Sequence, residues 1–220
     1  MDRSVATHVT DGVPQDLRQV TFVVVDTETT GASPYAHRLT EVAALKVRGG
    51  EVLGHFRSLV WGDDPIPGFI VSLTGIDDHM RRCAPFEADV IDAFRVFLGD
   101  AVIVGHNLRF DLGFLNAACT RGLGQSIDNH AVDTLLLARR LLRDEVDNFK
   151  LATLAHYLQL RSPSHRALAD VVTTTALLHA LIERLGSLGI ATLDDLQRWS
   201  APRKERTTSQ GRVPLIERTS

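Results

Sequence analysis

The feature that most constrains the fold of this chain is the stretch FVVVDTETTG at residues 22–31. It begins with an unbroken apolar run that is rich in β-branched valine, which predicts a strand buried on both faces. The run ends in Asp26 and Glu28, two positions apart, so an extended backbone directs both carboxylates to the same side. Crowded carboxylates at the edge of a core repel each other and lose hydration unless a cation lies between them. Because oxygen ligands favour Mg²⁺ or Mn²⁺, the stretch predicts a divalent-metal site.

The other patterns predict an α/β domain with a mixed, five-stranded sheet flanked by helices. Two apolar-rich stretches, 39–47 and 51–61, are separated by Gly49-Gly50, which suits a tight turn with positive φ. We therefore expect the first three strands to form an antiparallel meander, and 102–104 and 131–133 to add two strands. Apolar residues at helical spacing predict the covering helices, at 86–98, 108–121, 134–142, 150–158 and 167–185.

Composition narrows the classes of protein that fit. The chain has 220 residues, with 24 Lys plus Arg against 27 Asp plus Glu, and its net charge of −3 excludes a polyanion binder held by bulk charge. Any contact with nucleic acid must then be local. Cys83 and Cys119 have no CxxC or His companions, which argues against a zinc site or a disulfide framework and favours a reduced, intracellular setting. With no apolar leader and no spanning run, we expect a cytoplasmic protein that does not contact a membrane.

Changes in composition along the chain predict three regions. Residues 1–18 are polar and aperiodic and are expected to form a flexible lead-in, while 19–190 form the one catalytic-sized domain. Residues 191–220 are expected to form a polar tail or linker, because they contain two prolines and lack a periodic apolar face. From residue 198 onward the tail has six basic residues against two acidic ones, so its net charge is +4.

Further candidates for the chemistry lie later in the chain, and each also has an ordinary structural interpretation. Asp111, near the start of a predicted helix, would commonly serve the helix dipole, and Asp170 could be a boundary residue of the last long helix. His165 follows Pro163, so a helix that begins after it leaves the imidazole on a loop that can turn toward the acids. An imidazole has a pKa near neutrality, which suits proton abstraction. His106 follows a buried strand and is expected to order the turn at Asn107, a plausible N-cap.

Taken together, the segments VDTETTG, GHNLRFD and HRALAD resemble the three motifs of the DnaQ-like, DEDDh-type 3′–5′ exonucleases, which include the proofreading epsilon subunit of bacterial DNA polymerase III. The resemblance covers about residues 20–185 in the family's order. LTGI at 73–76 and DTLLLARRL from Asp133 match as well. It implies a ribonuclease H-like fold and a hydrolase that releases nucleoside 5′-monophosphates from the 3′ end of DNA, in proofreading or repair.

The resemblance also implies roles for individual residues. Two Mg²⁺ ions, replaceable by Mn²⁺, would be held by Asp26, Glu28, Asp111 and Asp170. His165 would be the general base. Two ions about 3.5–4 Å apart stabilise both the attacking and the leaving oxygen of a phosphodiester. The side chains implied around the terminal nucleotide are Thr29, Leu73, Thr74, Ile76, His106, Asn107 and Phe110. Leu73, Ile76 and Phe110 fit a structural role in the core equally well.

Several alternatives stay open at this point. The same motifs serve RNA trimming in related proteins, so an exoribonuclease is the nearest alternative to a DNA enzyme, and nothing in the residues discriminates the 2′-hydroxyl. A non-catalytic nucleic-acid-binding scaffold is a second, which the complete acidic and histidine set argues against. The expected partners are single-stranded or frayed 3′ ends of DNA, or RNA. The tail is either a disordered end or an attachment to a polymerase subunit, a clamp or a further nuclease domain.

Overall fold

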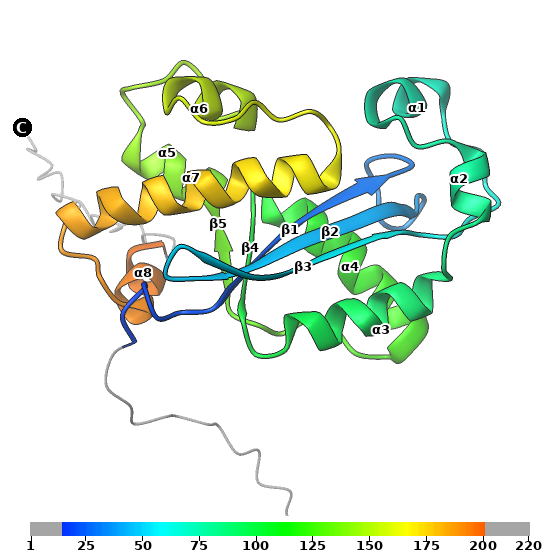
Figure 1. The fold of residues 1–220 in the computed structure, drawn as a ribbon, viewed down its shortest axis with the longest axis horizontal. Helices are drawn as coiled ribbons and strands as arrows, with labels where there is room; N and C mark the ends of the chain where they lie inside the picture. Colours follow the sequence, from blue (N-terminus) through cyan, green and yellow to red (C-terminus); the bar gives the residue numbers. More distant parts are fainter. Residues whose placement is uncertain (1–14, 201–220) are drawn as a thin grey trace, which may run out of the picture.

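The structure is a computed structural model that describes residues 15–200, and its centre is a mixed sheet with the strand order β3-β2-β1-β4-β5 (Figure 1). This confirms the predicted five-stranded sheet. The strands are β1 (Phe22–Thr29), β2 (Leu39–Arg48), β3 (Glu51–Leu59), β4 (Val102–Gly105) and β5 (Ala131–Asp133).

The first three strands form the predicted antiparallel meander. Gly49 and Gly50 make the turn between β2 and β3 with φ angles of 58° and 86°, which a residue with a side chain rarely adopts. β4 pairs with β1 in parallel, and β5 pairs with β4 in parallel. The carboxyl ends of β1, β4 and β5 therefore share one edge of the sheet. At that edge Glu28 of β1 lies opposite Glu41 of β2.

Eight helices lie within the described residues and cover both faces of the sheet. They are α1 (Gly68–Thr74), α2 (Asp78–Arg82), α3 (Glu87–Leu98), α4 (Leu108–Leu123), α5 (Thr134–Leu141), α6 (Leu151–Tyr157), α7 (Ala167–Ser187) and α8 (Leu193–Ser200).

The core has two main layers, and β1 contributes to both. Phe22 and Val24 pack against residues of α5, α6, α7 and α8, whereas Val23 and Val25 pack against α3 and α4. All four side chains are at most 3% exposed. This is the strand buried on both faces that its apolar run predicted.

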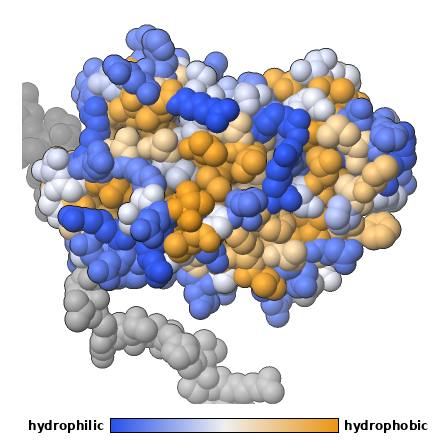
Figure 2. All heavy atoms as spheres, in the orientation of Figure 1, coloured by the Kyte–Doolittle hydropathy of each residue, from blue (hydrophilic) through white to orange (hydrophobic). Residues whose placement is uncertain are grey.

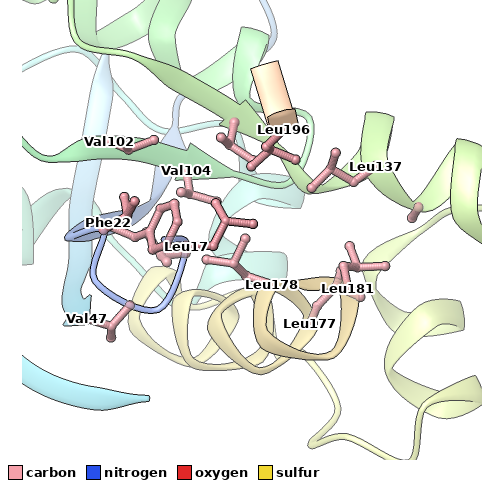
Figure 3. Close-up of a cluster of buried hydrophobic side chains, with 14 of the residues drawn as sticks. Leu17, Phe22, Val47, Val102, Val104, Leu137, Leu177, Leu178, Leu181 and Leu196 are labelled. Carbon is pink, nitrogen blue, oxygen red and sulfur yellow. The ribbon is translucent and has the colours of Figure 1, made fainter. Parts of the chain in front are cut away.

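Helix α8 is a departure from the predicted domain boundaries. Residues 193–200 were expected in a polar tail, yet they form a helix whose Leu196 is fully buried beside Val104 and Leu178 (Figure 3). The first described residues pack near α8. Leu17 donates a backbone hydrogen bond to Ala191, just before that helix, and the Leu17 side chain is 3% exposed although it was expected in the lead-in. The rest of the predicted lead-in and tail, 1–14 and 201–220, lies outside the described residues.

The edge strand β3 presents apolar side chains to solvent. In the orientation of Figure 1, Figure 2 shows hydrophobic residues between α7 and α3, where β2 and β3 lie, and hydrophilic residues toward both ends. On β3 itself, Val52 is 62% and Leu53 45% exposed. Within residues 15–200, no helix has both the length and the apolar character needed to cross a lipid bilayer.

Candidate active site

Three carboxylates meet where β1 ends and α7 begins. Asp26 and Glu28 come from β1, and Asp170 comes from the first turn of α7, which packs on β1 and β2. One oxygen of each lies within 4.8 Å of the others. Asp26 and Glu28 share a side because they are two positions apart on an extended strand, as the sequence predicted. Asp170 is buried, and the fold brings it to the pair from 142 residues beyond Glu28 (170 − 28).

Among the described residues, positive charge offsets the repulsion between these carboxylates only in part, through Arg166 near Glu28. Burial, and then the charges of Asp111, Glu28, Asp170 and Glu41, raise the pKa of Asp26 well above its usual range. Burial and the neighbouring acids raise the pKa of Glu28 to about 8. A donor set of oxygens that is crowded, desolvated and short of positive charge fits a divalent cation, which would restore the ionised forms.

Asp111 lies in the first turn of α4 and is 4% exposed. One of its oxygens accepts hydrogen bonds from the backbone N–H of Thr27, at 2.9 Å, and from the hydroxyl of Thr27, at 2.8 Å. Burial raises the pKa of Asp111 to about 7, and the two bonds from Thr27 oppose the rise. Asp111 is not one of the three mutually close ligands, but its charge is the largest neighbouring contribution to the raised pKa of Asp26. It therefore adds a fourth negative charge close to the cluster.

The loop before α7 carries His165 at the same edge of the sheet. α7 begins at Ala167, so His165 lies outside the helix, as Pro163 predicted. The loop is held to the cluster by the backbone N–H of Ser164, which donates to Asp170 Oδ1 at 2.8 Å. His165 has a left-handed backbone, with φ of 53°, and its side chain is exposed. The imidazole is thus exposed to solvent on a loop that is hydrogen-bonded to the cluster.

In the turn between β4 and α4, the side chains of His106 and Asn107 do not make the contacts that were predicted for the turn. The ring nitrogens of His106 contact Thr134 Oγ1 at 3.0 Å and the Phe149 carbonyl at 2.9 Å, so the ring supports the fold beside β5. Asn107 occupies the N-cap position, but its backbone is left-handed and its side chain makes no capping bond. Instead, its backbone N–H donates to Asp133 Oδ1 at 3.0 Å, and the side chain is left exposed.

The other implied nucleotide contacts divide into exposed and buried groups. Leu73, at the end of α1, is 48% exposed, and Phe110 is partly exposed beside Phe114. By contrast, Ile76 is fully buried in a small cluster with Ile66 and Ile70.

Two threonines in the implied set are also buried and bonded within the fold. Thr74 donates its hydroxyl to the Ile70 carbonyl, and Thr29 donates its hydroxyl to the Gly31 carbonyl. Among the implied residues, Leu73, Asn107 and Phe110 are thus more exposed to solvent than the buried members.

Sequence reasoning missed several residues that support the site. Gly31 is needed because a Cβ there would overlap the ring of His37. Asp133 accepts backbone hydrogen bonds from both Asn107 and Leu135, which ties the turn before α4 to the start of α5. Glu41 is fully buried on β2. The criterion that singled out Asp26, an acid within an apolar strand, could have identified Glu41 in LTEVAAL.

Comparison with known proteins places this geometry in a family. The family model described as RNase T, exonuclease, matches residues 23–178. A Mycobacterium tuberculosis protein named as a bifunctional exonuclease/endonuclease is 44% identical over 191 residues, which are 83% of this chain and 30% of that protein. The DNA polymerase III PolC-type of Bacillus subtilis is 38% identical over 197 residues, 86% of this chain and 14% of its own length. The chain thus spans less than a third of these relatives.

Solved structures agree with the fold. Escherichia coli exonuclease I in complex with a dT13 oligonucleotide superposes with a TM-score of 0.67 at 25% identity, over 78% of this chain and 43% of that one. The same enzyme in a zinc-bound complex with single-stranded DNA gives a TM-score of 0.68 at 25% identity, over 77% of this chain and 42% of that one. These matches confirm the expected ribonuclease H-like architecture. With the family model matching most of the chain and the acidic motifs in place, this chain belongs to the RNase T family of DnaQ-like exonucleases.

Proposed function

We propose that this chain is a Mg²⁺-dependent 3′–5′ exonuclease that releases nucleoside 5′-monophosphates from the 3′ end of DNA, in proofreading or repair. The observation that carries the proposal is the cluster of Asp26, Glu28 and Asp170, whose oxygens lie within 4.8 Å of one another and whose charges Arg166 offsets only in part. Such a set binds hard divalent ions, and exposed His165 lies on the loop beside it. A scaffold that only binds nucleic acid has no need of so many crowded acids.

DNA is favoured over RNA as the substrate. The matched exonuclease I structures are complexes with single-stranded DNA and with a dT13 oligonucleotide, and several relatives are DNA polymerases. In this chain, Leu73 from α1 and Phe110 from α4 offer exposed apolar surface for the terminal base. Stacking on such side chains is tolerant of base identity, which suits an enzyme that removes any 3′ nucleotide.

In the proposed hydrolysis, the acids would bind the metal ions and His165 would transfer the proton. Asp26, Glu28 and Asp170 would hold two Mg²⁺ ions, with Asp111 supplying further negative charge. When bound, the ions stabilise the oxygens that attack and leave the phosphorus. His165 accepts the proton of the attacking water at an imidazole nitrogen, for which its exposed loop position is suited. Since Asp26 and Glu28 have raised pKa values, they release protons on binding the ions, and affinity rises with pH.

A labelled-substrate time course tests the proposal. A single-stranded DNA labelled at its 5′ end, its RNA counterpart and a mispaired primer are incubated with Mg²⁺, with Asp170→Asn as the inactive control. We expect a ladder that shortens from the 3′ end, faster on DNA than on RNA, with 5′-monophosphates as products. Early release of the 5′ label, or equal activity in Asp170→Asn, would refute the proposal. Faster loss of RNA would instead indicate an exoribonuclease.

The partner prediction is separate from the chemistry. Attachment to a polymerase subunit, a clamp or a second nuclease domain was expected through the tail, of which residues 201–220 lie outside the described part of the chain. The PolC-type relatives are polymerases in which the matched region is a small part of the length, which supports a polymerase-linked role. Co-elution of the full chain with a polymerase subunit, lost when residues 201–220 are deleted, is the expected result.

A further inference from the structure

Glu41 of β2 is a fully buried carboxylate beside the active site that is not one of the three clustered ligands. It lies opposite Glu28 in the register of β1 and β2. Its oxygens contact Arg57 Nε at 2.8 Å and Arg166 Nη2 at 3.6 Å. A buried acid destabilises the fold unless it is paired and hydrogen-bonded. The contacts with the two arginines therefore decide whether Glu41 stabilises or destabilises the protein.

Glu41 also meets the start of α7. The N-cap residue of that helix is Arg166, which makes no side-chain capping bond. The first helical N–H groups lack partners within a helix, and an acid close to them is favourable. Here Glu41 Oε2 accepts from the backbone N–H of Ala167 at 3.4 Å, from 126 positions away in the chain. Strand β2 thus supplies the capping acceptor that the N-cap residue Arg166 does not provide.

Arg166 extends the same connection to a third segment. A Cβ placed on Gly75 would lie 3.9 Å from Arg166 Nη1, so the guanidinium lies against the end of α1. Gly75 follows Thr74 with a left-handed φ of 68° and ends that helix. Arg166 therefore contacts Glu41 of β2, its side chain lies near the glycine that ends α1, and its own backbone forms the start of α7.

We propose that Glu41 and Arg166 are positioning residues, which hold the start of α7 so that His165 and Asp170 stay aligned with the carboxylates of β1. The inference rests on the proposed function. Arg166 follows His165 directly in the chain, and Asp170 lies one turn into the helix whose first N–H is bound by Glu41. Neither positioning residue needs to touch the substrate. Because small displacements of reacting groups cost about 10²-fold in rate, a loosened helix start should lower turnover.

Arg166→Gln is the cleanest perturbation. Glu41 keeps Arg57 at 2.8 Å in this variant, so its buried charge is not left alone. The matched control is Arg184→Gln, in the last turn of the same helix. Arg184 is ion-paired with Glu145, and its side chain is 39% exposed against 36% for Arg166.

The kinetic test measures kcat and KM on single-stranded DNA with Mg²⁺ for the wild type, both arginine variants, His165→Ala, and the double variant of Arg166→Gln with His165→Ala. We expect Arg166→Gln to lower kcat about 10- to 100-fold with little change in KM, and Arg184→Gln to stay within about twofold. The loss should become smaller when His165 is already absent, because only the part that acts through Asp170 then remains. Fully multiplicative losses, a change confined to KM, or an equal loss in Arg184→Gln would overturn the proposal.

Amide hydrogen exchange in the metal-free protein supplies a readout that does not depend on activity. Arg166→Gln should increase exchange in residues 164–170 while leaving the strands unchanged, and Arg184→Gln should not affect that segment. Unchanged exchange at 164–170 in Arg166→Gln would overturn the positioning role even if the protein is a nuclease. Conversely, an inactive wild type would refute the proposed function and leave the exchange result as an independent measure of the helix start.

Discussion

Removing the charge of Glu28 is expected to stabilise the metal-free protein. Burial and the neighbouring acids raise the pKa of Glu28 from 4.5 to about 8. Between these values the folded protein keeps a proton that the unfolded chain releases, so the free energy of unfolding falls as the pH rises through the window. The substitution Glu28→Gln removes this dependence at that position, because the amide does not ionise.

The size of the effect follows from the width of that window. At pH 7 about 2.5 pH units of the window have been crossed, and at about 1.4 kcal/mol per unit the proton that Glu28 keeps in the folded protein lowers the free energy of unfolding by about 3 kcal/mol. Glu28 is partly exposed, so solvent screening reduces this figure. We therefore expect a gain of about 1–3 kcal/mol, or a rise in Tm of about 3–10 °C for a chain of this length.

Thermal unfolding in a chelating buffer at about pH 5 and about pH 8 measures this effect. The difference between Glu28→Gln and the wild type should be large at the higher pH and small at the lower one. Added Mg²⁺ should stabilise the wild type more than the variant. Glu51→Gln, an exposed acid at the far end of the sheet, is the control and should change little. A wild type with the same Tm at both pH values, or a Glu28→Gln protein that melts lower at about pH 8, would refute the reasoning.

Three further perturbations test other parts of the structure. His165→Ala should lower turnover about 10²–10⁴-fold in steady-state kinetics, the usual contribution of a positioned general base, and an unchanged rate would exclude that role. Thr27→Val removes the hydroxyl that donates to Asp111 and should cost about 1–3 kcal/mol in urea unfolding, whereas Thr27→Ser should be close to wild type. Leu196→Ala should cost about 2–5 kcal/mol in the same assay, and a cost near zero would mean that α8 is not part of the core.

The parts of the fold that the sequence predicted are those with strong local patterns. The apolar run from Phe22 to Val25 predicted a strand buried on both faces, and the spacing of Asp26 and Glu28 predicted that both carboxylates leave the same side. Gly49-Gly50 predicted the turn of the meander because few other residues adopt its φ values. These features depend only on neighbouring residues. The order of the five strands was not predicted, because no local pattern places β4 and β5 on the side of β1 away from β2.

The parts that were missed depend on contacts between distant residues. The segment that forms α8, LDDLQRWS, is short and polar, and it is helical where Leu196 enters a core built by other elements. His106 was expected to order the turn at Asn107, but its ring contacts are with Thr134 and Phe149, which no spacing rule connects to it. Glu41 likewise contacts the start of α7 from 126 positions away in the chain. Such pairings become visible only in the folded protein.

The bridge between Asp16 and Thr192 brings the two ends of the described fold together. The bridge lies near the start of β1 and the end of α7. The carboxylates lie at the end of β1 and the start of α7, a helix roughly 30 Å long, so the two features are at opposite ends of the fold. A polypeptide that enters and leaves a domain at neighbouring points can be spliced into a surface loop of a larger host with little distortion of either partner. The described fold therefore suits insertion into a larger protein, with the acidic cluster at the end of β1 opposite the bridge between Asp16 and Thr192.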